Sequence, residues 1–329
     1  MWEPVTPPAG PTGTAGSAHP AVGVSGPAEA LTELLSALAR RQHEHRARTA
    51  DRLEAVVGSA RLPDGLQDMA RYYLAKVQRD LGRARESAAG MRIVVDGGGR
   101  FAPPARRGLV HLARLAGDFP TALEMAAQLG WAGRQHRVEA DLHWPSGQFR
   151  RAAAAYQQAR HEAEQHRVAG EAATSQSMRA FVTALAHPDH AGPEIDLADQ
   201  LLAPLALRAS GFNVALARLA QDAGRRTELP ERAEVLRTEI QQAGLAPMAV
   251  TVDLVLALHH AVLGDADAAA ATVGRLRTAT EQAGEYRYFT EIAAFMADLP
   301  APANSPVRWL DAPDQVRSRW RQIVLDRRS

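Results

Sequence analysis

From residue 27 onward, apolar residues recur three and four positions apart, which is the period of an α-helix. Strand-like alternation is nowhere sustained. The clearest stretch runs from Gly147 to Ala159, where the spacing places four residues on one helix face: Phe149, Ala152, Tyr156 and Ala159. The small residues on that face suit a close crossing with a second helix. The pattern therefore predicts an all-α protein built from helical hairpins.

This pattern recurs as a turn residue, a small anchor five positions later, an apolar residue after four more and another after three. The anchors are 35, 30, 46, 35 and 36 residues apart, which scatters around the roughly 34-residue period of the tetratricopeptide repeat (TPR). An irregular bundle of Ala-rich helices is the alternative. The six copies are Gly82/Ser87/Met91/Val94, Gly117/Ala122/Ala126/Leu129, Gly147/Ala152/Tyr156/Ala159, Pro193/Ala198/Leu202/Leu205, Glu228/Ala233/Arg237/Ile240 and Gly264/Ala269/Val273/Leu276.

Copies four and five are degenerate, and the fifth needs Gly224 and an inserted RRTE to close its hairpin. A chain of 329 residues is long for one compact core, and the repeats favour an α-solenoid of about six TPR-like hairpins. We expect a disordered segment at 1–26, one or two leading helices at 27–62, the solenoid at 63–299, and a linker with a C-terminal capping helix at 300–329.

The two ends of the array carry their own helix signals. Pro27 suits the first turn of a helix whose apolar stripe we expect to be Leu31, Leu34, Leu35 and Leu38. His43 and His45 follow in a stretch that is polar all round, which indicates a solvated face. Asp311 is expected to cap a terminal helix that closes the array through Val316, Trp320, Ile323 and Val324.

Composition narrows the choice of partners. The chain has 46% hydrophobic and only 5% aromatic residues, so its packing relies on Ala, Leu and Val. With 38 basic and 37 acidic residues the net charge is +1, and no global field steers it to nucleic acid or to a membrane. It has no cysteine and no long uncharged apolar run, and we expect no signal peptide. We therefore expect a cytoplasmic protein that binds no nucleic acid directly.

Apparent catalytic motifs do not have the spacing that their chemistry requires. The triplet Gly97–Gly99 is no Walker A loop, because Lys76, the only lysine, is followed by Val77. His161 and His166 are five apart, unlike the four-residue spacing of zinc-binding helices. His259 and His260 are adjacent, so their side chains point in different directions on a helix. Glu162 and Glu164 are two residues apart and also diverge, which does not suit paired acid and base catalysis. We expect no catalytic residues, no metal and no cofactor.

Several strings in the chain carry a family resemblance: YYLAKVQRDLG, DGGGRFAPPARRGLVHLARLAGDFPTAL, LHWPSGQFRRAAAAY, and RWLD with SRWRQIV. From about Leu66 to its end, the chain resembles the C-terminal TPR arm of actinobacterial STAND and NB-ARC regulators. In such proteins the arm is a sensor or autoinhibitory element beside a nucleotide-binding engine. The resemblance implies a stand-alone relative or a detached sensor portion. The Arg-rich, nearly Lys-free composition is similar to that of high-GC actinobacterial proteins generally.

In a TPR-like solenoid the first helix of each hairpin lines the concave groove. Counting back from each anchor gives the expected partner-binding residues: Tyr72, Lys76, Arg79, Arg107, His111, Arg114, Arg134, Arg137, Asp141 and Trp144. This end of the groove is basic, whereas the last repeat offers Leu254, Leu258 and Ala261. Such a groove suits an acidic peptide with a hydrophobic tail. The alternative is that the arginines only solvate helix faces or pair with nearby carboxylates.

Three classes of function stay open from the sequence. The first is a non-enzymatic scaffold or sensor that binds a protein or peptide in the groove. The second is a ligand-sensing regulator that acts with a separately encoded NTPase or DNA-binding partner, since no helix-turn-helix precedes residue 63. The third, an enzyme on an α-solenoid, is disfavoured because no catalytic constellation is visible. The oligomeric state is not indicated.

Overall fold

The computed structural model describes residues 25–283, 285–300 and 305–329. Within these residues the chain is 77% helix and has no strand, which confirms the prediction of an all-α protein. Its α-helices are α1 (Pro27–Arg40), α2 (Arg46–Ser59), α3 (Asp64–Asp80), α4 (Ala84–Asp96), α5 (Ala102–Leu115), α6 (Phe119–Ala126), α7 (Gln135–His143), α8 (Phe149–Gln165), α9 (Ala169–Ala186), α10 (Ala191–Leu202), α11 (Arg208–Asp222), α12 (Leu229–Gln242), α13 (Ala246–Leu263), α14 (Ala266–Ala283), α15 (Arg287–Met296) and α16 (Pro313–Arg328).

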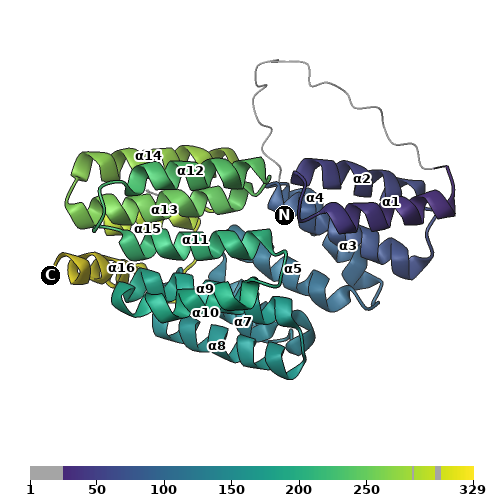
Figure 1. Cartoon of the computed structure of the whole chain (residues 1–329), viewed down its shortest axis with the longest axis horizontal. Helices are drawn as coiled ribbons and strands as arrows, with labels where there is room; N and C mark the ends of the chain where they lie inside the picture. The colour runs from purple at the N-terminus through teal and green to yellow at the C-terminus, as the bar shows by residue number, and fades with distance from the viewer. Residues whose placement is uncertain (1–24, 284, 301–304) are drawn as a thin grey trace, which may run out of the picture.

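Each helix packs against the next one along the chain, from α1 and α2 to α15 and α16 (Figure 1). Short 3-10 turns, η1 (Trp131–Gly133) and η2 (Pro188–His190), lie before α7 and α10. The six repeat copies found in the sequence coincide with the second helices of successive pairs, which are α4, α6, α8, α10, α12 and α14. The described part of the chain is therefore a succession of helical hairpins.

Four of the predicted hairpin turns use the same glycine geometry. Gly82, Gly117, Gly147 and Gly264 have φ angles of +79°, +82°, +70° and +75°, which residues with a Cβ rarely adopt. The residue after each glycine donates its backbone N–H to the last turn of the preceding helix; Arg83 N, for example, lies 2.8 Å from Gln78 O. This geometry satisfies helix C-terminal carbonyls while it reverses the chain.

The fourth copy begins differently from the prediction. Pro193 is not the turn residue, because α10 already starts at Ala191 and the turn is η2. Proline is tolerated there since the first turn of a helix has no intrahelical acceptor for its N–H. In the fifth copy Gly224 has a φ of +81°, and Glu228 precedes α12, in agreement with the extended turn expected there.

The anchors of all six copies face the interior. Their relative exposure is 0% at five positions and 2% at the sixth: Ser87, Ala122, Ala152, Ala198, Ala233 and Ala269. Ser87 also donates its hydroxyl to Ala75 O on α3, over 2.7 Å. The helix phase inferred from the sequence is confirmed, because small residues occur where the second helices cross their neighbours.

The leading segment forms two helices, one of the two arrangements that its pattern allowed. Its apolar stripe differs from the prediction: Leu34 is buried with Ala30 and Ala37, whereas Leu31 and Leu35 are 37% and 54% exposed. Ala30 and Ala37, which are seven residues apart, supply the close contact that leucine was expected to make. His43 and His45 are exposed. The sequence predicts disorder for the segment 1–26. Residues 1–24 of that segment lie outside the described residues.

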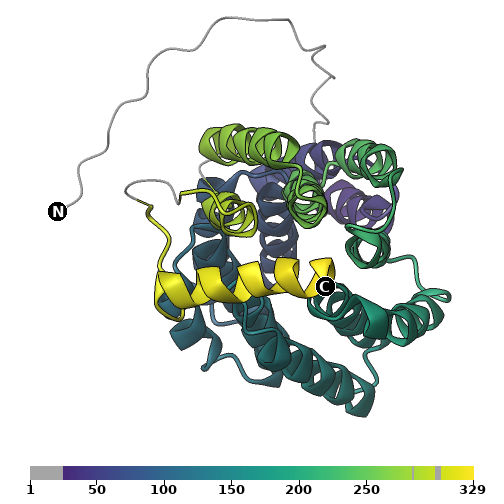
Figure 2. The ribbon, with the colours of Figure 1, turned by 90° about the vertical axis from the view of Figure 1, so that its left-hand side faces the viewer.

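The last helix, α16, runs across the end of the helical array (Figure 2). Its predicted face of Val316, Trp320, Ile323 and Val324 is buried. Trp320 donates its indole N–H to Pro145 O over 2.9 Å and stacks edge-on against Phe149. The predicted cap is wrong, because Ala312 precedes the helix and Asp311 instead accepts from Gln148 Nε2 over 2.6 Å.

Two terminal arginines of α16 bind the ends of three other helices. The Arg327 guanidinium donates to Ala220 O and Ala223 O, over 2.8 and 3.3 Å, at the end of α11. It also donates to the last-turn carbonyls of α9 at Ala184 and Leu185. Arg328 donates to Ala261 O at the end of α13. These cations satisfy helix C-terminal carbonyls and complement their negative partial charge.

The array curves so that its early and late helices meet. The turn between α12 and α13 abuts the turn between α1 and α2, since a Cβ on Gly244 would lie 2.9 Å from Arg46 N. Tyr286 N, just before α15, donates to Leu115 O at the end of α5 over 2.8 Å. The first helices of the hairpins consequently surround a central space.

Candidate functional site

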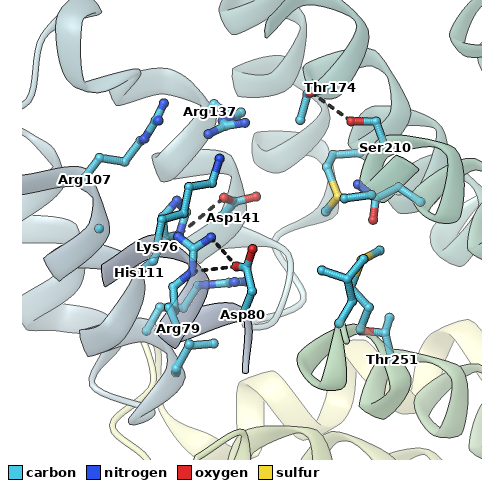
Figure 3. A pocket seen from close by; sticks show the side chains of 18 of the residues that line it. Lys76, Arg79, Asp80, Arg107, His111, Arg137, Asp141, Thr174, Ser210 and Thr251 are labelled. Carbon is cyan, nitrogen blue, oxygen red and sulfur yellow. Dashed lines mark hydrogen bonds and ion pairs between the residues drawn. The ribbon is translucent and has the colours of Figure 1, made fainter. Parts of the chain in front are cut away.

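The first helices of the six hairpins, α3, α5, α7, α9, α11 and α13, line one cavity of about 350 Å³. The α1–α2 turn and the start of α15 complete its wall. Figure 3 shows cationic side chains from α3, α5 and α7 on one side, and Thr174, Ser210 and Thr251 on the other. The cavity therefore has two walls of different chemistry, here called the basic wall (α3, α5, α7) and the opposite wall (α9, α11, α13, α15).

Nine of the ten residues expected in the partner-binding groove line this cavity: Tyr72, Lys76, Arg79, Arg107, His111, Arg114, Arg137, Asp141 and Trp144. Counting back from the anchors therefore selected nine residues that lie together in one cavity. Arg134 is the exception. It precedes α7 with a φ of +62°, and its guanidinium lies 3.9 Å from the centre of the Trp131 ring. Whether the nine residues bind a partner stays a prediction.

Both aspartates of the basic wall already have partners. Asp80 accepts from Arg79 over 2.8 Å and lies 3.6 Å from Arg46, a residue of the cavity that the sequence analysis missed. Burial lowers the pKa of Arg46 more than Asp80 raises it. Burial also lowers the Arg79 pKa, but the charge and hydrogen bond of Asp80, together with Tyr286 and Tyr72, outweigh burial and raise it. The carboxylate of Asp80 therefore neutralises only part of this end of the wall.

Asp141 is held by a buried tyrosine. Tyr156 donates its hydroxyl to Asp141 Oδ1 over 2.5 Å, and burial together with Asp141 raises the Tyr156 pKa well above its ordinary value. His111 Nδ1 lies 3.7 Å from Asp141 Oδ2. Burial and the charges of Arg114 and Arg79 lower the His111 pKa well below 6.5. His111 is therefore a neutral imidazole at neutral pH rather than a further cation.

Glu171, on α9, forms ion pairs with three arginines at the margin of the basic wall. Its carboxylate lies 2.9 Å from Arg137, 3.4 Å from Arg134 and 3.9 Å from Arg107. Burial would raise the Glu171 pKa, but the three guanidinium groups lower it, so the group is ionised at neutral pH. The single Glu171 carboxylate is thus shared by three guanidinium groups and offsets only one of their three positive charges. This pairing corresponds to the alternative that the sequence left open for part of the basic groove.

Two cations of the basic wall are not paired in this way. Within the described residues, no carboxylate lies within the 4.0 Å ion-pair limit of Lys76 or Arg114. The Nε atom of Arg114 is buried without a hydrogen-bond partner. The Arg114 pKa is raised despite burial, because the Tyr288 and Asp141 side chains lie nearby. Lys76 and Arg114 therefore present positive charge that a ligand could neutralise.

The opposite wall combines hydroxyl groups with apolar side chains. The Thr174 and Ser210 hydroxyls are 3.0 Å apart, which joins α9 to α11 across the wall. The apolar lining includes side chains that the sequence analysis did not assign to a groove: Met178, Phe181, Leu216, Met248, Tyr286, Tyr288 and Phe289. Of these residues, only the aromatics at the start of α15 stand out in the sequence, as the cluster YRYF at 286–289. Their place in the cavity follows from the curvature of the array.

The apolar end of the groove is not where the sequence placed it. Leu254, Leu258 and Ala261 are at most 4% exposed and belong to the main hydrophobic core, together with residues of α15 and α16. The part of α13 that lines the cavity is instead Met248 and Thr251, one to two turns earlier. The covering helices α15 and α16 both contact α13, and no repeat pattern indicated this contact.

His161 and His259, two of the histidines weighed as metal ligands or catalytic groups, do not line the cavity. His161 contacts Gln165 over 2.9 Å on the exposed side of α8, and His259 accepts from Gly224 N over 3.1 Å. Residues 25–283, 285–300 and 305–329 hold no cluster of three potential metal-binding side chains. Across the same residues, no helix is long and apolar enough to span a bilayer.

Comparison with protein-family models gives no match, and neither the curated proteins nor the solved structures contain a chain that matches this one. The geometry of the cavity is thus the main basis for a functional proposal.

Proposed function

We propose that the chain is a non-enzymatic, TPR-like binding protein that holds the end of an acidic peptide in its central cavity. The observation that supports this most directly is the cavity itself. It is lined by the first helix of each of the six repeat hairpins, and cationic and apolar walls face one another across it. A volume of about 350 Å³ suits a few residues of an extended chain rather than a folded domain.

The basic wall fits carboxylates because its acids are already engaged. Asp80 and Asp141 are bound by Arg79 and Tyr156, whereas Lys76 and Arg114 have no acidic partner among the described residues. A bound carboxylate would take the place of the water that these cations lose in the cavity. The guanidinium fork of arginine can hold a carboxylate through two hydrogen bonds. We assign the leading role to Arg114 and Lys76, since Arg137 is already bound to Glu171.

The opposite wall fits the rest of a peptide. Thr174, Ser210 and Asn213 offer hydrogen-bonding groups for a peptide backbone, and Met178 and Met248 offer adaptable apolar surface. This arrangement keeps the amphipathic character that the sequence suggested. It replaces an apolar end of the groove by an apolar wall opposite the cations.

A regulator that senses its ligand is the second candidate. One observation favours it: the cavity is bounded by both early and late parts of the array, from Arg46 at the start of α2 to Phe289 on α15. A ligand that bridges these parts would stabilise the curved arrangement over a more open one. The protein would then pass this change to a separately encoded NTPase or DNA-binding partner. Ligand-dependent change in radius of gyration, measured by small-angle X-ray scattering, tests this candidate.

A fluorescence-anisotropy titration tests the main proposal. The probes are fluorescein-labelled peptides of glutamates ending in leucines, and a matched set with glutamines in place of glutamates. We expect binding of the acidic set that weakens as salt rises, and about tenfold weaker binding by Arg114→Gln. Arg150→Gln, on the exposed side of α8, is the matched control and should bind normally. Equal binding of both peptide sets would refute the role of the basic wall.

A further inference from the structure

Lys76 is unusual in both composition and position. The chain has 38 basic residues, and Lys76 is the only one that is not arginine. It lies on α3 in the central cavity, and Figure 3 shows it between His111, Arg107 and Arg137. No ion pair or hydrogen bond within the described residues engages its amine. A chain that uses arginine at every other cationic position thus has its single amine side chain in the cavity.

Lysine differs from arginine in one property that matters here. An ammonium group can lose its proton near neutral pH when it is desolvated or placed beside other cations, whereas a guanidinium cannot. Burial lowers the Lys76 pKa; Arg79 and Arg107 lower it further, while Tyr72 and Asp80 oppose them. The surroundings therefore make the neutral amine, which is the nucleophilic form, easier to reach than in an ordinary lysine side chain.

We propose that Lys76 captures an anionic carbonyl compound, an aldehyde or a 2-oxo acid, as a reversible Schiff base. The neutral Nζ forms a bond to the carbonyl carbon, and the carbonyl π electrons move to the oxygen. The two protons of the amine leave with this oxygen as water, and a C=N bond remains. Nothing is oxidised or reduced, and hydrolysis reverses the step.

Neighbouring side chains match the other parts of such a ligand. Arg107 and Arg114, on α5, can hold a carboxylate or phosphate group of the ligand. Tyr72 lies one helical turn before Lys76 on α3, on the same face, and its hydroxyl is 3.5 Å from an Arg107 nitrogen. Burial opposes ionisation of Tyr72, but the Lys76 and Arg107 charges lower its pKa, which suits proton exchange with the departing oxygen.

This inference goes beyond peptide binding, because it holds for any small anionic carbonyl compound that enters the cavity. The two proposals therefore fail separately. A protein that binds acidic peptides but forms no adduct would refute only the Schiff base. A protein that forms the adduct but ignores acidic peptides would refute only the proposed function.

Reductive trapping tests the inference on the full chain. The protein is incubated at neutral pH with glyoxylate and sodium cyanoborohydride, and peptide mapping by mass spectrometry quantifies the adduct at Lys76 and at the α-amino group. We expect Lys76 to react about tenfold faster than the α-amino group in the folded protein, and to lose this advantage in urea. Acetaldehyde, which has no anionic group, should react with Lys76 more slowly than glyoxylate does.

The matched variants separate the amine from the anion-binding groups. Lys76→Arg keeps the charge and the melting temperature but should lose the adduct completely. Arg114→Gln should reduce the preference for glyoxylate over acetaldehyde. The inference is overturned if Lys76 reacts no faster than the α-amino group, or if its reactivity is the same in the folded and the urea-unfolded protein. Equal rates with the two aldehydes would overturn the requirement for an anionic ligand.

Discussion

Glu285, between α14 and α15, should destabilise the protein as the pH rises from 4.5 to about 7. The residue is 5% exposed, and neither carboxylate oxygen has a hydrogen-bond partner within the described residues. Burial raises the Glu285 pKa from 4.5 to about 7, although Arg79 opposes this shift. The folded state therefore holds the proton more tightly than the unfolded state does.

The direction and size of the effect follow from this difference in pKa. Between pH 4.5 and about 7 the unfolded chain releases the Glu285 proton first, so the free energy of unfolding falls as the pH rises. One pKa unit corresponds to about 1.4 kcal/mol, so the full difference amounts to about 3 kcal/mol at about pH 8. Glu285→Gln removes the charge while it keeps the shape of the side chain. It should stabilise the protein by up to this amount at about pH 8 and by little at about pH 4.

Urea denaturation followed by circular dichroism at both pH values measures the effect. Glu124→Gln, at an exposed position on α6, is the matched control and should leave the pH dependence unchanged. The reasoning is refuted if Glu285→Gln and the wild-type protein lose stability equally between the two pH values. A variant that is less stable than wild type at about pH 8 would show that the ionised carboxylate makes a favourable contact.

Three further substitutions test the packing and the polar contacts, each by urea denaturation. Ala152→Leu should cost about 1–3 kcal/mol, because the added carbons enter the close crossing of α8 with its neighbours. Tyr156→Phe should cost about 1.5–3 kcal/mol, because it removes the hydrogen bond to a buried carboxylate. Arg327→Gln should cost about 2–3 kcal/mol, because carbonyls at the ends of α9 and α11 lose a charged donor.

Each of these substitutions has a control at a more exposed position. Gln157→Leu lies on the solvent side of α8 and should change stability little; losses equal to those of Ala152→Leu would contradict the assigned helix phase. Tyr73→Phe and Arg321→Gln serve in the same way for Tyr156 and Arg327. If Arg321→Gln were as costly as Arg327→Gln, the helix-end carbonyls would not be the source of the effect.

The local features of the fold could be predicted because they depend on residues close in sequence. Gly82 and Ser87 specify a turn and a helix crossing within a few residues of each other, and both occur as expected. Leu31 and Leu35 show the limit of this reasoning. They have the right spacing for a buried stripe, yet alanines on the neighbouring face make the contact. Periodicity alone does not tell which of two overlapping faces the next helix covers.

The candidate site divides in the same way. Tyr72, Arg107 and Arg137 lie on first helices whose phase follows from the nearby anchors, so the sequence places them in the cavity. Arg46 and Tyr288 come to the cavity only because the array curves until its early and late helices meet. Such curvature is a sum of small rotations between hairpins, and it has no signature at any single residue.

The contacts of α16 also have a consequence for the order of folding. Most helices pack against a chain neighbour, so hairpins can form early from local contacts. The hydrogen bond from Trp320 to Pro145 spans 175 residues, and that from Arg327 to Leu185 spans 142. Closing such long loops is slow, and α16 is synthesised after every helix that it binds. During synthesis the hairpins must therefore exist for a time without α16, with the surface that Trp320 covers open to solvent and to chaperones.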